Sequence, residues 1–248
     1  MYYLTLIVVI IGFLMSGCTP AAHDGMEGMD GMHENTASYS AENFSTGSGI
    51  SFLIRKNNAV MTEFGTSHTK QMHLLVVRDD LTHFSHLHPV MGSGGVWSVA
   101  FKPEAAGTYW MYADFTDTDD THSVQRFAQK YEGNNGAYGL TPDAAETKKV
   151  DGLSVHFSPV FNGKDATLAY EVTKNGKPVA LEDYLGAKGH AIVLTADGQY
   201  LHAHADTDAL SFRVTLPAAD AFYRTFVEFQ SEGNVHGTSF DIIQTGAN

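Results

Sequence analysis

The sequence predicts an all-β protein in which two tandem antiparallel β-sandwich domains follow a disordered N-terminal arm. From residue 50 onward, short apolar or alternating runs are separated by Gly, Asn, Asp and Pro, which is typical of antiparallel strands and their turns. No long stretch after the apolar leader has the 3.6-residue period of an amphipathic helix. The two halves of the chain can also be laid over each other, which indicates a repeated unit.

Residues 1–17 form an apolar leader. Its apolar core is short for a membrane span and suits a signal peptide. The segment "LMSGC" resembles the bacterial lipobox, in which the cysteine is lipidated and becomes the mature N-terminus, although no Lys or Arg precedes the apolar run. We therefore expect lipidation at Cys18 and an exported protein anchored to a bacterial membrane, facing the periplasm or the exterior. An uncleaved N-terminal anchor is the alternative.

Residues 18–49 are expected to form a flexible arm, because they are rich in small and polar residues and poor in β-branched aliphatic ones. Within the arm, "HDGMEGMDGMHE" places a methionine at every third position between two histidines. Thioether sulfur is a soft ligand, so this segment favours Cu(I) or Ag(I). A tether whose methionines bind nothing is the alternative. The candidate ligands of the arm are His23, Met26, Met29, Met32 and His33.

We expect the first sandwich at residues 50–130, a polar, turn-rich linker at 131–150, and the second sandwich at 151–248. The short strand-like runs that follow one another in the second half favour a sandwich. The clearest expected strands are, in chain order, 73–77, 96–101, 108–115, 153–159, 166–173, 190–195, 210–216, 222–229 and 238–243.

The repeat pairs eight of the thirteen histidines. "HLLVV" matches "HAIVL", "HLHP" matches "HAHA", and "PEAAGTYWMYADF" matches "PAADAFYRTFVEF", which also pairs Asp114 with Glu228. The paired histidines are His73, His86, His88 and His122 in the first half and His190, His202, His204 and His236 in the second.

Each H-x-H segment predicts two histidines on one side of a strand, because residues i and i+2 share a face. Two such imidazoles suit Cu(II) or Zn(II), and a third ligand would have to come from a neighbouring strand. In the first half we expect His86 and His88 to be joined by His73 or His122. Histidines that only bond to backbone carbonyls and to each other are the alternative.

The segments "MHLLVVRDDLTHFSHLHP" and "GTYWMYADF" resemble the YtkA-like, or heavy-metal-associated, secreted β-sandwich domains of bacterial lipoproteins. The resemblance covers residues 70–122 well and 187–236 more loosely, since Ala205 and Glu228 replace the proline and aspartate of the first copy. It implies Ig-like or cupredoxin-like sandwiches and a link to copper or another heavy metal.

A net charge of −13 argues against nucleic acid as a partner. The common hydrolase motifs are absent from the sequence, which disfavours an enzyme. The single cysteine directly follows the leader, far from the expected sandwiches, which disfavours a blue-copper site. We therefore expect an envelope lipoprotein that binds copper or a related metal for buffering, delivery or resistance, with a metal-handling envelope protein as a possible partner. A structural or interaction module is the alternative.

Overall fold

The computed structural model describes residues 38–46, 49–134, 136–205, 208–218 and 221–243. These residues form two antiparallel β-sandwiches, so the predicted fold class is confirmed. They contain no α-helix, and their one helical element is the 3₁₀ turn η1 (Ser93–Gly95). In this part of the chain no helix could cross a membrane.

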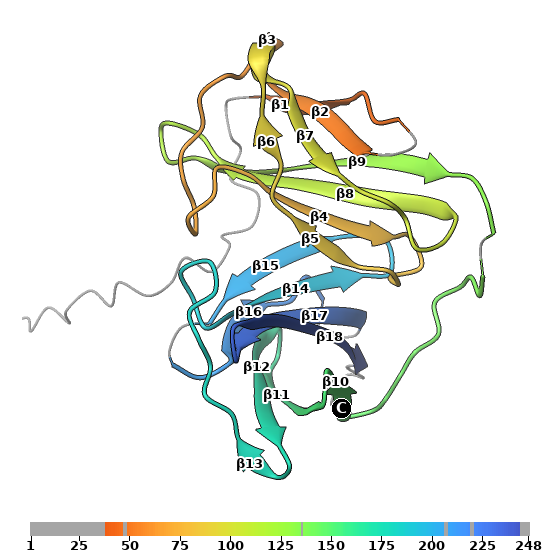
Figure 1. Cartoon of the computed structure of the whole chain (residues 1–248), viewed down its shortest axis with the longest axis vertical. Helices are drawn as coiled ribbons and strands as arrows, with labels where there is room; N and C mark the ends of the chain where they lie inside the picture. Colours follow the sequence, from red (N-terminus) through yellow and green to blue (C-terminus); the bar gives the residue numbers. More distant parts are fainter. Residues whose placement is uncertain (1–37, 47–48, 135, 206–207, 219–220, 244–248) are drawn as a thin grey trace, which may run out of the picture.

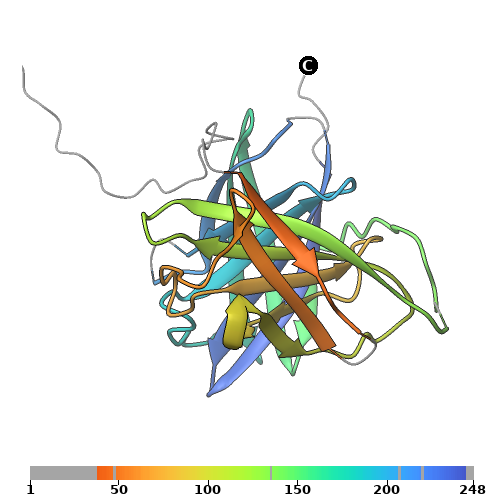
Figure 2. The same cartoon turned by 90° about the horizontal axis from the view of Figure 1, so that it is seen from above.

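The first sandwich consists of a five-stranded outer sheet and a four-stranded inner sheet. The outer sheet contains β1 (Tyr39–Asn43), β2 (Gly49–Lys56), β3 (Ala59–Val60), β6 (Val90–Met91) and β7 (Trp97–Ala100). The inner sheet runs in the order β5 (Ser85–Leu87), β4 (His73–Arg78), β8 (Gly107–Thr116) and β9 (His122–Tyr131). Seen from above, β2 of the outer sheet crosses the long strands of the inner sheet (Figure 2).

The second sandwich repeats this plan. Its outer sheet contains β10 (Thr147–Val150), β11 (Leu153–Asn162), β12 (Asp165–Lys174), β13 (Lys177–Pro178) and β16 (Ser211–Thr215). Its inner sheet runs in the order β15 (Tyr200–His204), β14 (Gly189–Thr195), β17 (Phe222–Ser231) and β18 (Asn234–Ile243). The two inner sheets face each other in the middle of the molecule, between the two outer sheets (Figure 1).

Both inner sheets are covered on both faces, which explains why β4 and β14 are almost wholly apolar between their end residues. Leu74 and Val76 of β4 pack into the core of the first sandwich. Leu75 and Val77 point to the other face and join an apolar cluster that also contains Ile192 of β14. Because side chains alternate along a strand, a strand buried on both faces loses the apolar–polar alternation of a half-exposed one. The two sandwiches therefore share an interface with its own apolar core.

Two boundaries differ from those expected. β1 lies inside the segment 18–49, where we expected only a flexible arm, and it pairs with β2 along five residues. Its polar composition hides an alternation in which Tyr39 and Ala41 pack on the core of the first sandwich. β10 likewise lies inside the expected linker 131–150 and pairs with β11. Each sandwich thus begins earlier in the chain than its clearest apolar strand suggests.

Candidate metal centre between the two sandwiches

Three histidines of the first sandwich come together on the face of the inner sheet that meets the second sandwich. His86 lies opposite Leu75 in the pairing of β4 with β5, so both side chains point to the interface. His73, two residues before Leu75, and His88, two residues after His86, share that face. One ring nitrogen from each histidine lies within 4.8 Å of the other two. We call His73, His86 and His88 the first triad.

The second sandwich builds the same arrangement from the equivalent strands. His190 of β14 lies directly opposite His204 of β15, and His202 lies opposite Ile192, a member of the interface core. Ring nitrogens of the three histidines again lie within 4.8 Å of one another. We call His190, His202 and His204 the second triad. The H-x-H pairs thus share a face, and the third histidine of each triad comes from the neighbouring central strand.

Hydrogen-bond partners fix the tautomers in the first triad. His73 Nε2 lies 3.1 Å from the carbonyl oxygen of Ser67, which can only accept, so this nitrogen carries the proton. His86 Nδ1 donates to a carboxylate oxygen of Glu228 at 2.8 Å. A neutral imidazole has one protonated nitrogen, so the lone pairs of His73 Nδ1 and His86 Nε2 point at each other across 3.0 Å. A metal ion between these two nitrogens, or a proton on His86 Nε2 donated to His73 Nδ1, makes the contact favourable.

The second triad has the same tautomers. His190 Nε2 donates to the carbonyl oxygen of Tyr184 at 3.0 Å, and His202 Nδ1 donates to a carboxylate oxygen of Asp114 at 3.0 Å. The lone pairs of His190 Nδ1 and His202 Nε2 therefore face each other across 3.3 Å. The two accepting carbonyls, of Ser67 and Tyr184, belong to equivalent short turns in the two sandwiches, each closed by an isolated β-bridge.

The second histidine of each H-x-H pair contributes a nitrogen without a hydrogen-bond partner. Nε2 of His88 and Nε2 of His204 are buried and have no hydrogen-bond partner among the described residues. A buried polar atom without a partner costs roughly 1–3 kcal/mol of folding free energy. The same atom is left unpaired at equivalent positions of both sandwiches. Each triad therefore brings together three ring nitrogens that neutral imidazoles can present as metal ligands.

Burial keeps most of these rings neutral. Desolvation, with smaller contributions from neighbouring histidines, lowers the pKa of His73 to about 4 and that of His88 to about 3. The same causes lower the pKa of His190 to about 2, and burial also lowers the pKa of His204. Only a neutral imidazole can bind a metal ion. These four rings are therefore in the metal-binding form throughout the physiological pH range.

Carboxylates cross the interface to reach the triads. Asp114 of β8, in the first sandwich, accepts from His202 and from the Tyr200 hydroxyl at 2.8 Å, while its other oxygen accepts from His122 Nε2 at 2.7 Å. Burial works to raise the pKa of Asp114, but the hydrogen bonds from His122 and His202 hold it well below the usual value. Glu228 of β17 is the counterpart from the second sandwich and contacts His86.

The two triads are neighbours, so the six rings form one cluster. Ring centroids of His73 and His202 lie 5.7 Å apart, and those of His86 and His190 lie 5.8 Å apart. Ring centroids within a triad are separated by similar distances, such as 5.2 Å between His73 and His86. A seventh histidine, His68 from the first sandwich, stacks on His204 with ring centroids 3.4 Å apart.

Two histidines that the repeat predicted as ligands do not join the triads. The ring of His122 contacts Asp114, and the ring of His236 lies 2.9 Å from a carboxylate oxygen of Asp151. His122 pairs with Thr116 and shares the interface face with Asp114, whereas His236 pairs with Phe229, whose side chain points into the core of the second sandwich. His122 and His236 keep the same spacing in sequence as the neighbouring repeat positions, so the sequence alone does not show that their side chains point to different faces.

The turn lengths explain the difference between His122 and His236. Five residues separate β8 from β9, but only two separate β17 from β18. The second hairpin therefore pairs in a different register relative to the repeat, and its histidine changes face. The remaining predicted sites lie outside the described residues: Cys18, His23, Met26, Met29, Met32 and His33.

Sequence reasoning missed the carboxylates. The repeat pairs Asp114 with Glu228 but assigns them no role, and His68 is not among the predicted ligands. The signal that could have identified the interface is the uninterrupted apolar character of the two strands that begin at His73 and His190. In an antiparallel sheet such strands indicate burial on both faces, and therefore contact with the second sandwich.

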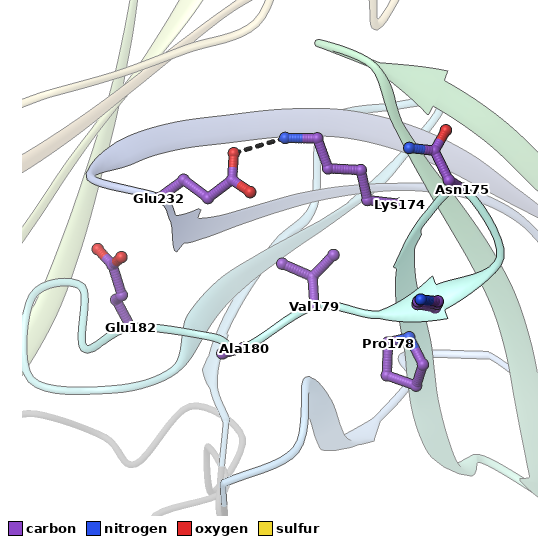
Figure 3. A pocket seen from close by; sticks show the side chains of 8 residues that line it. Lys174, Asn175, Pro178, Val179, Ala180, Glu182 and Glu232 are labelled. Atoms are coloured by element: carbon purple, nitrogen blue, oxygen red, sulfur yellow. Dashed lines mark hydrogen bonds and ion pairs between the residues drawn. The ribbon is translucent and has the colours of Figure 1, made fainter.

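A surface pocket elsewhere in the second sandwich has a different character. It is lined by Lys174, Asn175, Lys177, Pro178, Val179, Ala180, Glu182 and Glu232 (Figure 3). An ion pair of 2.7 Å between Lys174 and Glu232 lies beside it, with side chains that are 44% and 60% exposed. Such a solvated pair is worth little energetically. No histidine lines this pocket, so its chemistry is unrelated to that of the triads.

A family model described as a domain of unknown function (DUF8832) matches residues 29–132 and 148–246. The match includes two copies of the domain, in agreement with the two sandwiches and with the repeat read from the sequence. The first matched segment begins at residue 29, before the start of the first sandwich that we expected at residue 50. No curated protein matches the sequence. The resemblance to YtkA-like domains stays an expectation.

Solved structures match at low identity. A segment of two fibronectin type III domains from chicken tenascin is 11% identical, with a TM-score of 0.26, over 82% of this chain and 97% of that one. The adhesin InvE of Yersinia pseudotuberculosis is 14% identical, with a TM-score of 0.23, over 83% of this chain and 58% of that one. At these scores the likenesses carry no information about function.

Proposed function

The chain belongs to the family described as domain of unknown function DUF8832, and we propose that its paired sandwiches bind transition-metal ions, copper or zinc, in the two histidine triads. Each triad takes one ion through His73 Nδ1, His86 Nε2 and a ring nitrogen of His88, or through the equivalent atoms of the second triad. The protein is then an envelope module for buffering, delivery or resistance. This role is one of binding and not of catalysis.

The facing lone pairs carry this proposal. Two nitrogens bound to one ion at about 2.0–2.1 Å lie about 2.9 Å apart at a right angle and about 3.3 Å apart at the tetrahedral angle. The separations of 3.0 Å and 3.3 Å in the two triads fall in this range. An ion between the nitrogens would remove the repulsion between their lone pairs. It would also give the unpaired nitrogens of His88 and His204 a partner.

The ligand type narrows the choice of ion. Neutral imidazole suits zinc and copper, whereas magnesium and calcium prefer oxygen ligands. Three protein ligands leave a fourth position for water or for a ligand supplied by another protein. A site of this kind can exchange its ion more readily than a closed four-ligand site. It therefore fits a module that accepts an ion and passes it on.

The N-terminal segment supplies the cellular setting of the proposal. Lipidation at Cys18 would hold the sandwiches at a bacterial membrane, on the periplasmic or external side. Met26, Met29 and Met32, with His23 and His33, would form a soft site for Cu(I) upstream of the triads. An ion could then move between the methionine arm and the imidazole sites, or to another metal-handling protein of the envelope.

The test is metal stoichiometry in the purified full-length chain, loaded separately with Cu(I), Cu(II) and Zn(II). We expect two Zn(II) per chain, because Zn(II) is a poor partner for thioethers and so reports on the triads alone. The variant His86→Ala/His88→Ala should lose one of the two ions, and His202→Ala/His204→Ala should lose the other.

A matched control comes from the same segment of sequence. His83 lies three residues before His86, but its ring contacts Glu104 and does not belong to the first triad. The variant His83→Ala should keep both Zn(II) ions. Unchanged stoichiometry in the two double variants, together with lower melting temperatures, would refute the metal sites. It would support the alternative, a structural or interaction module whose histidines only join the two sandwiches.

A further inference from the structure

The carboxylate partners of the two triads are exchanged between the sandwiches. His86 of the first triad donates to Glu228 of the second sandwich, with the His86 side chain fully buried. His202 of the second triad donates to Asp114 of the first sandwich, with the His202 side chain 5% exposed. The repeat pairs His86 with His202 and Asp114 with Glu228. The two hydrogen bonds therefore join equivalent residues: in each, a histidine of one sandwich donates to a carboxylate of the other.

The neighbouring aromatic contacts follow the same exchange. Phe84 of the first sandwich stacks on Phe226 of the second, with ring centroids 4.4 Å apart. Tyr200, the repeat partner of Phe84, stacks on Tyr112 of the first sandwich at 4.9 Å. The exchange of carboxylates thus belongs to a docked interface with approximate two-fold symmetry, and is not an accident of one side chain.

A carboxylate behind a ligating histidine has a defined effect. It accepts the ring N–H, which fixes the tautomer and the ring orientation, and it raises the basicity of the other nitrogen. Loss of such a carboxylate typically lowers metal affinity by roughly 10- to 100-fold. The negative charge also compensates part of the charge of an ion in a buried site. In this protein both effects reach each triad from the opposite sandwich.

We infer that the triads form a reciprocal pair of metal sites, in which each sandwich supplies the ring nitrogens for one ion and the positioning carboxylate for the other. This inference rests on the proposed metal binding. Asp114 is then a positioning residue for the second triad, and Glu228 is one for the first. An ion binds more tightly to docked sandwiches than to separated ones, so by linkage metal binding stabilises the docked arrangement.

The experiment measures Zn(II) affinity by competition with a chromophoric chelator in full-length chains that keep one triad. The variant His86→Ala/His88→Ala keeps the second triad, and His202→Ala/His204→Ala keeps the first. Asp114→Asn and Glu228→Gln are introduced separately into each background. These substitutions keep the size of the side chain and remove its charge, and each serves as the control for the other.

A crossed pattern is expected. With only the second triad present, Asp114→Asn should weaken Zn(II) binding roughly 10- to 100-fold, while Glu228→Gln should change it by less than about 2-fold. With only the first triad present, the effects should be reversed. A residue that only supported the fold would weaken both triads alike. The side chain of Glu228 is 16% exposed and that of Asp114 is 6% exposed, so Glu228→Gln can carry the test if Asp114→Asn does not fold.

Other patterns overturn the inference in different ways. If each carboxylate acts on the triad of its own sandwich, or on both triads equally, the reciprocal arrangement is wrong while the metal sites stand. If a folded single-triad chain binds no Zn(II) at any concentration tested, the proposed function fails and the inference fails with it.

Discussion

The buried histidines should make the metal-free protein sensitive to mild acid. His73 is 2% exposed and His190 is fully buried, and burial lowers their pKa values to about 4 and about 2. In the unfolded chain both rings take up protons as the pH falls through about 6.5. The folded chain keeps them neutral to far lower pH. Protons therefore favour the unfolded chain, and the free energy of unfolding falls as the pH falls below 6.5.

The size of the effect follows from the pKa values. Between pH 7 and pH 5, each ring shifts the free energy of unfolding by about 2 kcal/mol, at 1.36 kcal/mol for each pH unit below about 6.5. The two rings together give about 4 kcal/mol. A typical domain has only about 5–15 kcal/mol of stability. The loss is thus a large part of the total.

The assay is urea unfolding of the chelator-treated protein at pH 7 and pH 5, for the wild type and for His73→Gln/His190→Gln. Glutamine can still donate a hydrogen bond to the backbone carbonyl but does not titrate in this range. All other acid-sensitive groups are common to both proteins. The variant should therefore lose about 4 kcal/mol less than the wild type on acidification. An equal loss in the two proteins would refute the account of these rings as buried and neutral.

Three further predictions concern single features of the chain. Cys18→Ser should move the protein from the membrane fraction to the soluble fraction, because stable anchoring needs the acyl chains of a lipidated cysteine; retention in the membrane fraction would point to an uncleaved anchor. Replacing Met26, Met29 and Met32 by Leu should lower the Cu(I) stoichiometry and leave Zn(II) binding unchanged, and an unchanged Cu(I) stoichiometry would show that the arm is only a tether. Gly189→Ala should lower the free energy of unfolding by about 1–3 kcal/mol. The Cβ of the new alanine would lie 2.3 Å from a leucine methyl and 2.7 Å from a backbone oxygen of β17. Urea unfolding that gives the wild-type stability would contradict this packing.

Local geometry made part of the site predictable. His86 and His88 share a face because strand residues alternate, and the repeat placed His73 next to them as one of two possible third ligands. The repeat could not choose between His73 and His122, since that choice depends on strand order: β4 lies next to β5, whereas β9 lies at the opposite edge of the sheet. The repeat also could not show that His122 and His236 point to different faces, because that depends on pairing register. Register depends on turn length, and the turns after β8 and β17 differ by three residues.

The long-range part of the site could not be predicted in the same way. The contact between Asp114 and His202 joins residues 88 positions apart, and it exists only because two inner sheets dock face to face. Periodicity reports which face of a strand is buried, but not what covers that face. β1 was missed for a related reason, because a polar edge strand with few buried side chains has nearly the composition of a flexible arm.

The exchanged contacts have a consequence for each half of the chain taken alone. Each type of contact between the two halves is made twice, so the first half carries both of the residues that such a contact needs. For the aromatic stacking these residues are Phe84 and Tyr112, and for the hydrogen bond they are His86 and Asp114. A surface of this kind is self-complementary, as in a two-fold symmetric homodimer. The intact protein is in effect a dimer made within one chain, and the link between its halves keeps their mutual effective concentration high. Mutations that cut this link, or shorten it until the two halves of one chain can no longer dock, would favour exchange of halves between molecules over separation of the halves.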